Sequence, residues 1–142
     1  MASHSIAAGE GYVERVFGHM RTTPDFVPLY RVQPTARSLD THGVSYAELG
    51  ARVHALVQVL EHRRLDAGDR VLMSLGDPVD LLTAVLATMA LGLIAVPLQT
   101  HREFRTSTLF RERMTRVAQD CPPILVMVEN LEAWRATMVE AD

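Results

Sequence analysis

Short apolar segments alternate with helical segments through the second half of the chain, and this alternation limits the fold more than any other feature. In chain order, the expected strands and helices are 70–75, 77–91, 94–98, 109–119, 124–128 and the residues that follow Asn130. Apolar strands that alternate with helices predict right-handed crossovers and a largely parallel sheet. The expected fold class is therefore α/β in three layers, a sheet flanked by helices.

The starts of two helices can be located from the residues. Ser45 and Glu48 form the pattern of a capping box ahead of an apolar stripe that runs to about Arg64. Asp77 followed by Pro78 is a helix cap with proline at the first helical position. We therefore expect helices to begin at both places.

The N-terminal part reads as a helix and a loose hairpin. One apolar face predicts a helix over 11–21, and a strand is expected over 26–32, although Pro28 makes it an edge or irregular strand. Residues 33–43 are rich in turn formers, and 44–46 is the expected returning strand.

Positions where the strand and helix periodicities coincide predict the core. The expected core residues are Leu56, Val57, Leu60, Val71, Met73, Leu82, Val85, Leu86, Val96, Leu125 and Val126. The longest apolar stretch, 79–98, contains Asp80, Gly92 and Pro97, so it is interpreted as a buried helix and strand and not as a membrane span.

Composition excludes several classes of function. The chain has 142 residues, a net charge of -3 and no lysine, since its 14 basic residues are all arginine. Nucleic-acid binding is not expected at this charge, and lysine-dependent phosphate binding or Schiff-base chemistry is excluded. A single cysteine, Cys121, and the lack of a signal-peptide pattern in 1–10 favour a cytoplasmic location.

From the residues alone, no catalytic, cofactor-binding or metal-ligating residue is assigned. Asp77 and Asp80 could form an acid–base pair, but capping of the helix is the favoured interpretation. Gly76 before Asp77 is only a weak phosphate-binding signal. The six histidines lack metal-ligand spacing. The arginines of the 100–116 segment form either a solvated helix face or an anion-binding patch; they are Arg102, Arg105, Arg111, Arg113 and Arg116.

Three segments, in order, resemble the adenylate-forming superfamily of acyl-CoA synthetases, peptide-synthetase adenylation domains, luciferases and fatty acyl-AMP ligases. They are Val-Ser-Tyr-Ala-Glu-Leu at 44–49, Gly-Asp-Arg-Val at 68–71, and the Ala-Val-Pro-Leu element that ends 87–98. The Pro-Asp-x-x-Pro-Leu of 24–29 also fits, and the resemblance covers about residues 10–130. The long arginine-bearing segment at 100–119 favours a fatty acyl-AMP ligase, and a peptide-synthetase or acyl-CoA synthetase origin stays open.

The resemblance implies that residues 1–142 are a single α/β domain and an N-terminal fragment of a larger adenylation domain. Intact members use ATP and Mg²⁺ to convert a carboxylic acid to an acyl-adenylate, and then pass the acyl group to CoA or an acyl carrier protein. The family's phosphate loop, adenine-site aromatic motif, ribose-binding aspartate and catalytic lysine lie further downstream. The fragment alone is therefore expected to be inactive and to need the remainder of the domain.

Three further interpretations stay open. The chain could be a stand-alone interaction module that binds a carrier protein or synthase through the arginines of 100–116. It could instead be an unrelated flavodoxin-like domain, which would need a ligand crevice at the carboxyl ends of its strands. Because the 79–91 helix is apolar on nearly every side, we also expect an exposed apolar surface and a homodimer or swapped pair.

Overall fold

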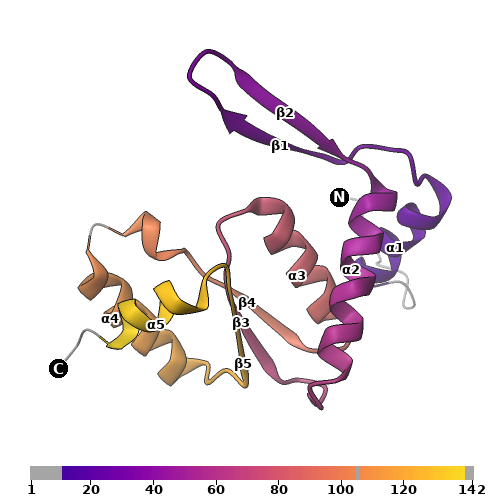
Figure 1. Cartoon of the computed structure of the whole chain (residues 1–142). Coiled ribbons are helices and arrows are strands. Elements are labelled where there is room, and N and C mark those ends of the chain that lie inside the picture. Colours follow the sequence, from indigo (N-terminus) through magenta and orange to yellow (C-terminus); the bar gives the residue numbers. More distant parts are fainter. Residues whose placement is uncertain (1–10, 105, 140–142) are drawn as a thin grey trace, which may run out of the picture. The chain divides into compact units, whose positions relative to one another are not determined.

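The structure, a computed structural model, describes residues 11–104 and 106–139 (Figure 1). The chain divides into two compact units, Met1–Ala51 and Arg52–Asp142, and each is described by itself. In order, the elements are α1 (Tyr12–Thr22), β1 (Leu29–Pro34), β2 (Leu39–Val44), α2 (Tyr46–Glu61), β3 (Arg70–Ser74), α3 (Pro78–Ala90), β4 (Ile94–Pro97), the 3₁₀ turn η1 (His101–Glu103), α4 (Ser107–Asp120), β5 (Leu125–Val128) and α5 (Leu131–Val139).

The second unit is built on a parallel sheet of three strands in the order β4-β3-β5. Val71 lies opposite Ala95 on one side and Leu125 on the other, and both pairings are parallel. Each connection between consecutive strands contains a helix, as parallel pairing requires. The expected α/β class with a parallel sheet is confirmed.

Helices cover the two faces of this sheet with separate apolar clusters. Val71 and Met73 of β3 pack with Ala84 of α3 on one face. Leu72, which points to the other face, packs with Phe110 and Met114 of α4. Trp134 and Met138 of α5 pack against this second cluster. The sheet therefore lies between two helical layers, in agreement with the sequence.

The core agrees only in part with the expected list. Leu60, Val71, Met73 and Leu86 are buried, but Val126 is 39% exposed, so its assignment to the core was wrong. Val126 lies on β5, which pairs only with β3 among the residues that the structure describes, so apolar character does not ensure burial there. The other expected core residues are half-buried; they are Leu56, Val57, Leu82, Val85, Val96 and Leu125.

Helix α3 begins and ends where the sequence indicates. The Asp77 carboxylate accepts hydrogen bonds from the amides of Val79 (2.9 Å) and Asp80 (3.1 Å), so the predicted cap is confirmed. At its end, Gly92 has a φ of +69°, and the Leu93 amide donates to the Thr88 carbonyl. Within the described ranges, no helix has the length and apolarity needed to cross a membrane.

The hairpin of the first unit is longer and more regular than expected. β1 and β2 pair antiparallel from Leu29 opposite Val44 to Pro34 opposite Leu39, so most of 33–43 is strand and not turn. A short turn closes it, in which the Thr35 hydroxyl accepts from the Ser38 amide. The outer strand residues are exposed and mostly polar, which is why apolar alternation did not reveal them.

The predicted start of α2 at the Ser45 cap is confirmed, but the end of the returning strand, the end of α2 and the start of α4 differ from the prediction. The returning strand ends at Val44, and Tyr46 is already helical, with the Ser45 hydroxyl accepting from the Glu48 amide at 3.2 Å. Helix α2 ends at Glu61, before the expected limit near Arg64. Helix α4 begins earlier than expected, because the Thr106 hydroxyl caps it by accepting from the Leu109 amide.

Candidate functional site

The carboxyl ends of the three parallel strands form the place where this topology can hold a ligand. From β3, the chain passes through α3 to β4 on one side and returns through α4 to β5 on the other. A crevice at such a reversal of strand order is the usual ligand site of open α/β sheets. A small hollow of about 100 Å³ lies there, lined by Ser74, Thr100, Arg102, Val128, Glu129, Asn130, Ala133 and Trp134.

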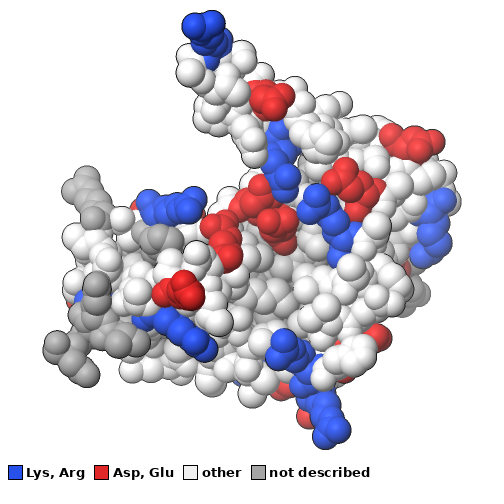
Figure 2. All heavy atoms as spheres, viewed as in Figure 1, with Lys and Arg blue, Asp and Glu red and all other residues white. Residues whose placement is uncertain are grey.

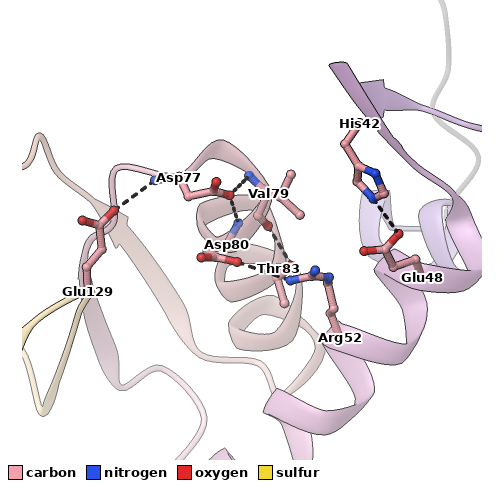
Figure 3. Close-up of polar contacts among 8 residues, drawn as sticks. All are labelled: His42, Glu48, Arg52, Asp77, Val79, Asp80, Thr83 and Glu129. Atoms are coloured by element: carbon pink, nitrogen blue, oxygen red, sulfur yellow. Dashed lines mark hydrogen bonds and ion pairs between the residues drawn. The ribbon is translucent and has the colours of Figure 1, made fainter. Parts of the chain in front are cut away.

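The amides at the start of α3 already hold a carboxylate of the chain itself. Glu129, directly after β5, accepts hydrogen bonds from the backbone amides of Gly76 and Asp77 through one carboxylate oxygen. Together with the Asp77 cap, this contact places two negative groups where the helix dipole favours them (Figure 3). The position at which a phosphate would bind this helix is therefore occupied by Glu129.

A second carboxylate closes the turn after β4. Glu103 accepts hydrogen bonds from the amide (3.1 Å) and the hydroxyl (3.2 Å) of Thr100, which is 5% exposed. The buried Ser74 hydroxyl donates to the Gln99 carbonyl. These donors at the strand ends are thus hydrogen-bonded within the chain. The crevice that the flavodoxin-like interpretation needs is present only as the small hollow, and these donors are not free to bind a ligand in it.

Asp77 and Asp80 do not form an acid–base pair on a shared ligand. Asp77 is held by the helix amides, whereas Asp80 forms an ion pair with Arg52 of α2 at 3.5 Å. Both partners of this ion pair are more than one-third exposed, so it adds little stability. Figure 2 shows acidic side chains gathered where α3 begins, an unfavourable surface for an anionic nucleotide.

The arginines of the 100–116 segment separate into different roles. Arg111 is half-buried and donates to the Thr137 carbonyl of α5 at 3.1 Å, so it ties α4 to α5. Arg113 and Arg116 are exposed and line a shallow hollow on α4 with Phe104 and Leu109. Arg105 lies outside the described residues.

The histidines and the cysteine have local contacts. A His62 ring nitrogen lies 2.6 Å from the Gln58 carbonyl, and His42 lies 3.7 Å from the Glu48 carboxylate. Cys121 is half-buried at the end of α4. Over residues 11–104 and 106–139, no three metal-ligating side chains come together. It stays a prediction that no residue of this chain takes part in catalysis or binds a cofactor.

Glu129 and Glu103 were missed by sequence reasoning. The signal for Glu129 is an acidic residue that directly follows an apolar strand, at the same end of the sheet as the amides before α3. That signal can be interpreted only once the strand order is known. Glu103 follows Thr100 by three residues, which is a local turn pattern within a segment that was expected to be an exposed loop.

Comparison with known proteins places the chain in a family. Residues 19–142 match the family described as AMP-binding enzyme. Tenellin synthetase of Beauveria bassiana (strain ARSEF 2860) is 26% identical over 141 residues, which are 97% of this chain but 3% of the synthetase.

Solved structures agree at the level of the fold. The fatty acid AMP ligase from Legionella pneumophila superposes with a TM-score of 0.68 and 21% identity, over 82% of this chain and 19% of the ligase. The N-terminal subdomain of Klebsiella oxytoca NpsA, in complex with 3-hydroxybenzoyl-AMSN, gives a TM-score of 0.69 and 20% identity, over 87% of this chain and 28% of that one. With the family match over most of its length, the chain belongs to the AMP-binding enzyme family.

Proposed function

We propose that the chain is the N-terminal structural part of an enzyme that converts a fatty acid and ATP to an acyl-adenylate. The acyl group then passes to a thiol of CoA or of an acyl carrier protein. The family match over residues 19–142 supports the adenylating role, and the likeness in fold to a fatty acid AMP ligase is compatible with the acid. The chain spans less than a third of the length of each of the two solved relatives described above, so catalysis belongs to the complete enzyme.

The observation that carries this proposal is the family match over residues 19–142. The structure adds that Glu129 and Glu103 accept hydrogen bonds from backbone amides at the strand ends, so these donors are not free to bind a ligand. Mg²⁺-bound ATP supplies an electrophilic phosphorus and needs cationic or amide donors around its phosphates. The described residues do not fit it, because the amides before α3 hold Glu129 and the chain has no lysine. The role of these residues is to supply half of a scaffold on which other residues act.

Pyrophosphate release tests the proposal. We expect no release above background when the 142-residue chain is incubated with ATP, Mg²⁺ and fatty acids of different length. The product of the complete reading frame should release pyrophosphate with the same acids. Turnover by the 142-residue chain, or none by the complete product with any carboxylic acid, would contradict the proposal.

A second candidate function is a carrier-protein docking module on α4. Arg113 and Arg116 are exposed beside Phe104 and Leu109, which gives a surface with cationic and apolar groups together. Such a surface complements an acidic helical partner. Titration of the 142-residue chain with an acyl carrier protein should then show saturable binding that Arg113→Glu with Arg116→Glu abolishes. Arg63→Glu with Arg64→Glu, a matched exposed pair after α2, should leave that binding unchanged.

A further inference from the structure

Positive charge is concentrated in one segment of an otherwise acidic chain. Residues 100–116 contain five arginines and two glutamates, which give a net charge of +3, although the whole chain has a net charge of -3. One of the two glutamates, Glu103, is held by the amide and the hydroxyl of Thr100. A local surplus of positive charge attracts acidic partners to this part of the surface.

The outer stripe of α4 carries two arginines of this segment. This stripe consists of Leu109, Glu112, Arg113 and Arg116, which lie three or four positions apart and therefore share one side of the helix. Together with Phe104 they line a hollow of about 270 Å³. Among residues 11–104 and 106–139, neither Arg113 nor Arg116 has a hydrogen-bond or ion-pair partner. Both guanidinium groups are therefore available to a partner.

The inner side of α4 holds this stripe in place. Phe110 and Met114 are 0% and 2% exposed and pack with Leu72 of β3. On a further side, Arg111 donates to the Thr137 carbonyl of α5. A stripe on a helix that is fixed in this way is formed before a partner arrives, so binding costs little ordering of the chain.

Apolar groups lie beside the two arginines. Leu109 is 48% exposed, and the ring of half-buried Phe104 packs edge-on against Phe110, with 5.3 Å between ring centroids. An apolar side chain of a partner can pack on Leu109 and Phe104 while acidic groups beside it reach the arginines. Arginine and aromatic side chains are also the types that are enriched at protein interfaces.

Glu112 makes the stripe selective. It lines the same hollow as the two arginines, so the stripe is not uniformly positive. Nucleic acid and anionic membranes carry negative charge everywhere and would place some of it against Glu112, which is unfavourable. An amphipathic helix can match the stripe, because side chains at three- and four-residue spacing place each charge at a chosen position.

We propose that the outer stripe of α4 binds an amphipathic helix of a partner protein. An apolar residue of that helix packs on Phe104 and Leu109. Acidic residues near it pair with Arg113 and Arg116, and the residue opposite Glu112 is uncharged or basic. The inference rests on the second candidate function and deepens it, since it names the element that the stripe recognises and the charge pattern of that element.

The test uses the 142-residue chain and a fluorescein-labelled helical peptide of about 18 residues, built on alanine with leucine and two glutamates on one face. Fluorescence anisotropy measures the dissociation constant. We expect saturable binding that weakens about tenfold in the Arg113→Glu, Arg116→Glu double variant, because two attractions become repulsions. The Arg63→Glu, Arg64→Glu double variant changes an exposed pair after α2 and should bind as the parent chain does.

A second peptide separates this charge pattern from general attraction. It keeps the leucine and the glutamates and has two further glutamates on the same face in place of alanine. We expect it to bind the parent chain more weakly than the first peptide, and Glu112→Gln should remove the difference. General attraction gives the opposite order, because the second peptide carries more negative charge.

Three outcomes would overturn the proposal. They are no saturable binding of the first peptide, equal weakening in the two double variants, and tighter binding of the more acidic peptide to the parent chain. Vesicles of phosphatidylglycerol serve as a further probe, and binding to them in preference to the peptide would assign the stripe to a membrane and overturn the proposal as well. Because the assay contains neither ATP nor a carrier protein, its failure is distinct from failure of either proposed function.

Discussion

Glu129 shows how one side chain can decide what a fold position is able to bind. The start of α3 has the free amides that attract anions in many α/β proteins. Here a carboxylate from the neighbouring strand end takes the amides of Gly76 and Asp77. Gly76 is part of the arrangement, because a Cβ at this position would lie 2.8 Å from that carboxylate oxygen.

Removal of the Glu129 charge should weaken this link. We expect Glu129→Gln to lower the free energy of unfolding by about 0.3–1 kcal/mol, because a neutral amide interacts less with the helix dipole. Glu112→Gln, at an exposed position in the middle of α4, is the control and should change it by less. Urea melts measure both. Equal effects of the two variants would show that the contact adds nothing to stability.

Ser45 caps fewer amides at the start of α2 than the sequence predicts. The Glu48 amide does bond the Ser45 hydroxyl, as expected of a capping box. The other amides of the first turn find carbonyls instead, since Tyr46 donates to Phe26 and Ala47 donates to Pro24. The Pro24–Leu29 segment was interpreted as part of an edge strand and of a family motif, and its capping role depends on a chain path that no local pattern reveals.

The Ser45 cap should still be measurable. Ser45→Ala is expected to cost on the order of 1 kcal/mol, because it removes the acceptor of the Glu48 amide only. Ser45→Asp, which keeps an acceptor, should restore most of the loss. Thermal melts followed by circular dichroism give both values. An alanine variant as stable as the parent would mean that water replaces the hydroxyl.

At the scale of elements, the sequence predicted those with a buried apolar face best. Strands β3, β4 and β5 and helix α3 lie within one or two residues of their expected limits. The hairpin was placed poorly because strand residues such as Asp40 and His42 are exposed and polar, so they form no apolar pattern. Patterns of apolar residues indicate which positions are buried, and the outer hairpin has few buried positions.

Two glycines should respond to alanine in opposite directions. Gly92 has a φ of +69°, so Gly92→Ala should destabilise by about 1–2 kcal/mol. Gly18 lies within α1 with open space around it, and Gly18→Ala should stabilise by about 0.5–1 kcal/mol. Denaturant melts of the two variants test the pair. A stabilised Gly92→Ala variant would contradict the positive-φ termination of α3.

Helix α3 is the element on which the sheet unit should depend most. Leu86 is 1% exposed, so Leu86→Ala should cost about 2–5 kcal/mol through lost burial and a residual cavity. Met89 on the same helix is 39% exposed and provides the control, since Met89→Ala should cost well under half as much. A change of less than half a kilocalorie for Leu86→Ala would show that this helix is not central.

At the scale of the whole molecule, the candidate site depended on information that no single segment contains. The residues predicted the α/β class and the lack of lysine chemistry, and the family resemblance extended that to adenylation. The hydrogen bond that occupies the amide before α3 could not be predicted, because it joins Glu129 to Gly76 across 53 positions of the chain. Such a contact follows from strand order, which is a property of the assembled sheet.

The two compact units should differ in stability. Val71 and Met73 of β3 are fully buried between two helical layers, whereas Tyr30 and Val32 of the hairpin are 64% and 52% exposed. A hairpin of two strands is marginally stable without a packed face. Amides of β3 should therefore exchange slowest, and those of β1 and β2 much faster. In the Leu86→Ala variant, a loss of about 2 kcal/mol in the free energy of unfolding should speed amide hydrogen exchange in β3 by roughly thirtyfold. Exchange of the hairpin amides should be unchanged. Exchange that accelerates equally in both units would mean that the chain unfolds as one cooperative body.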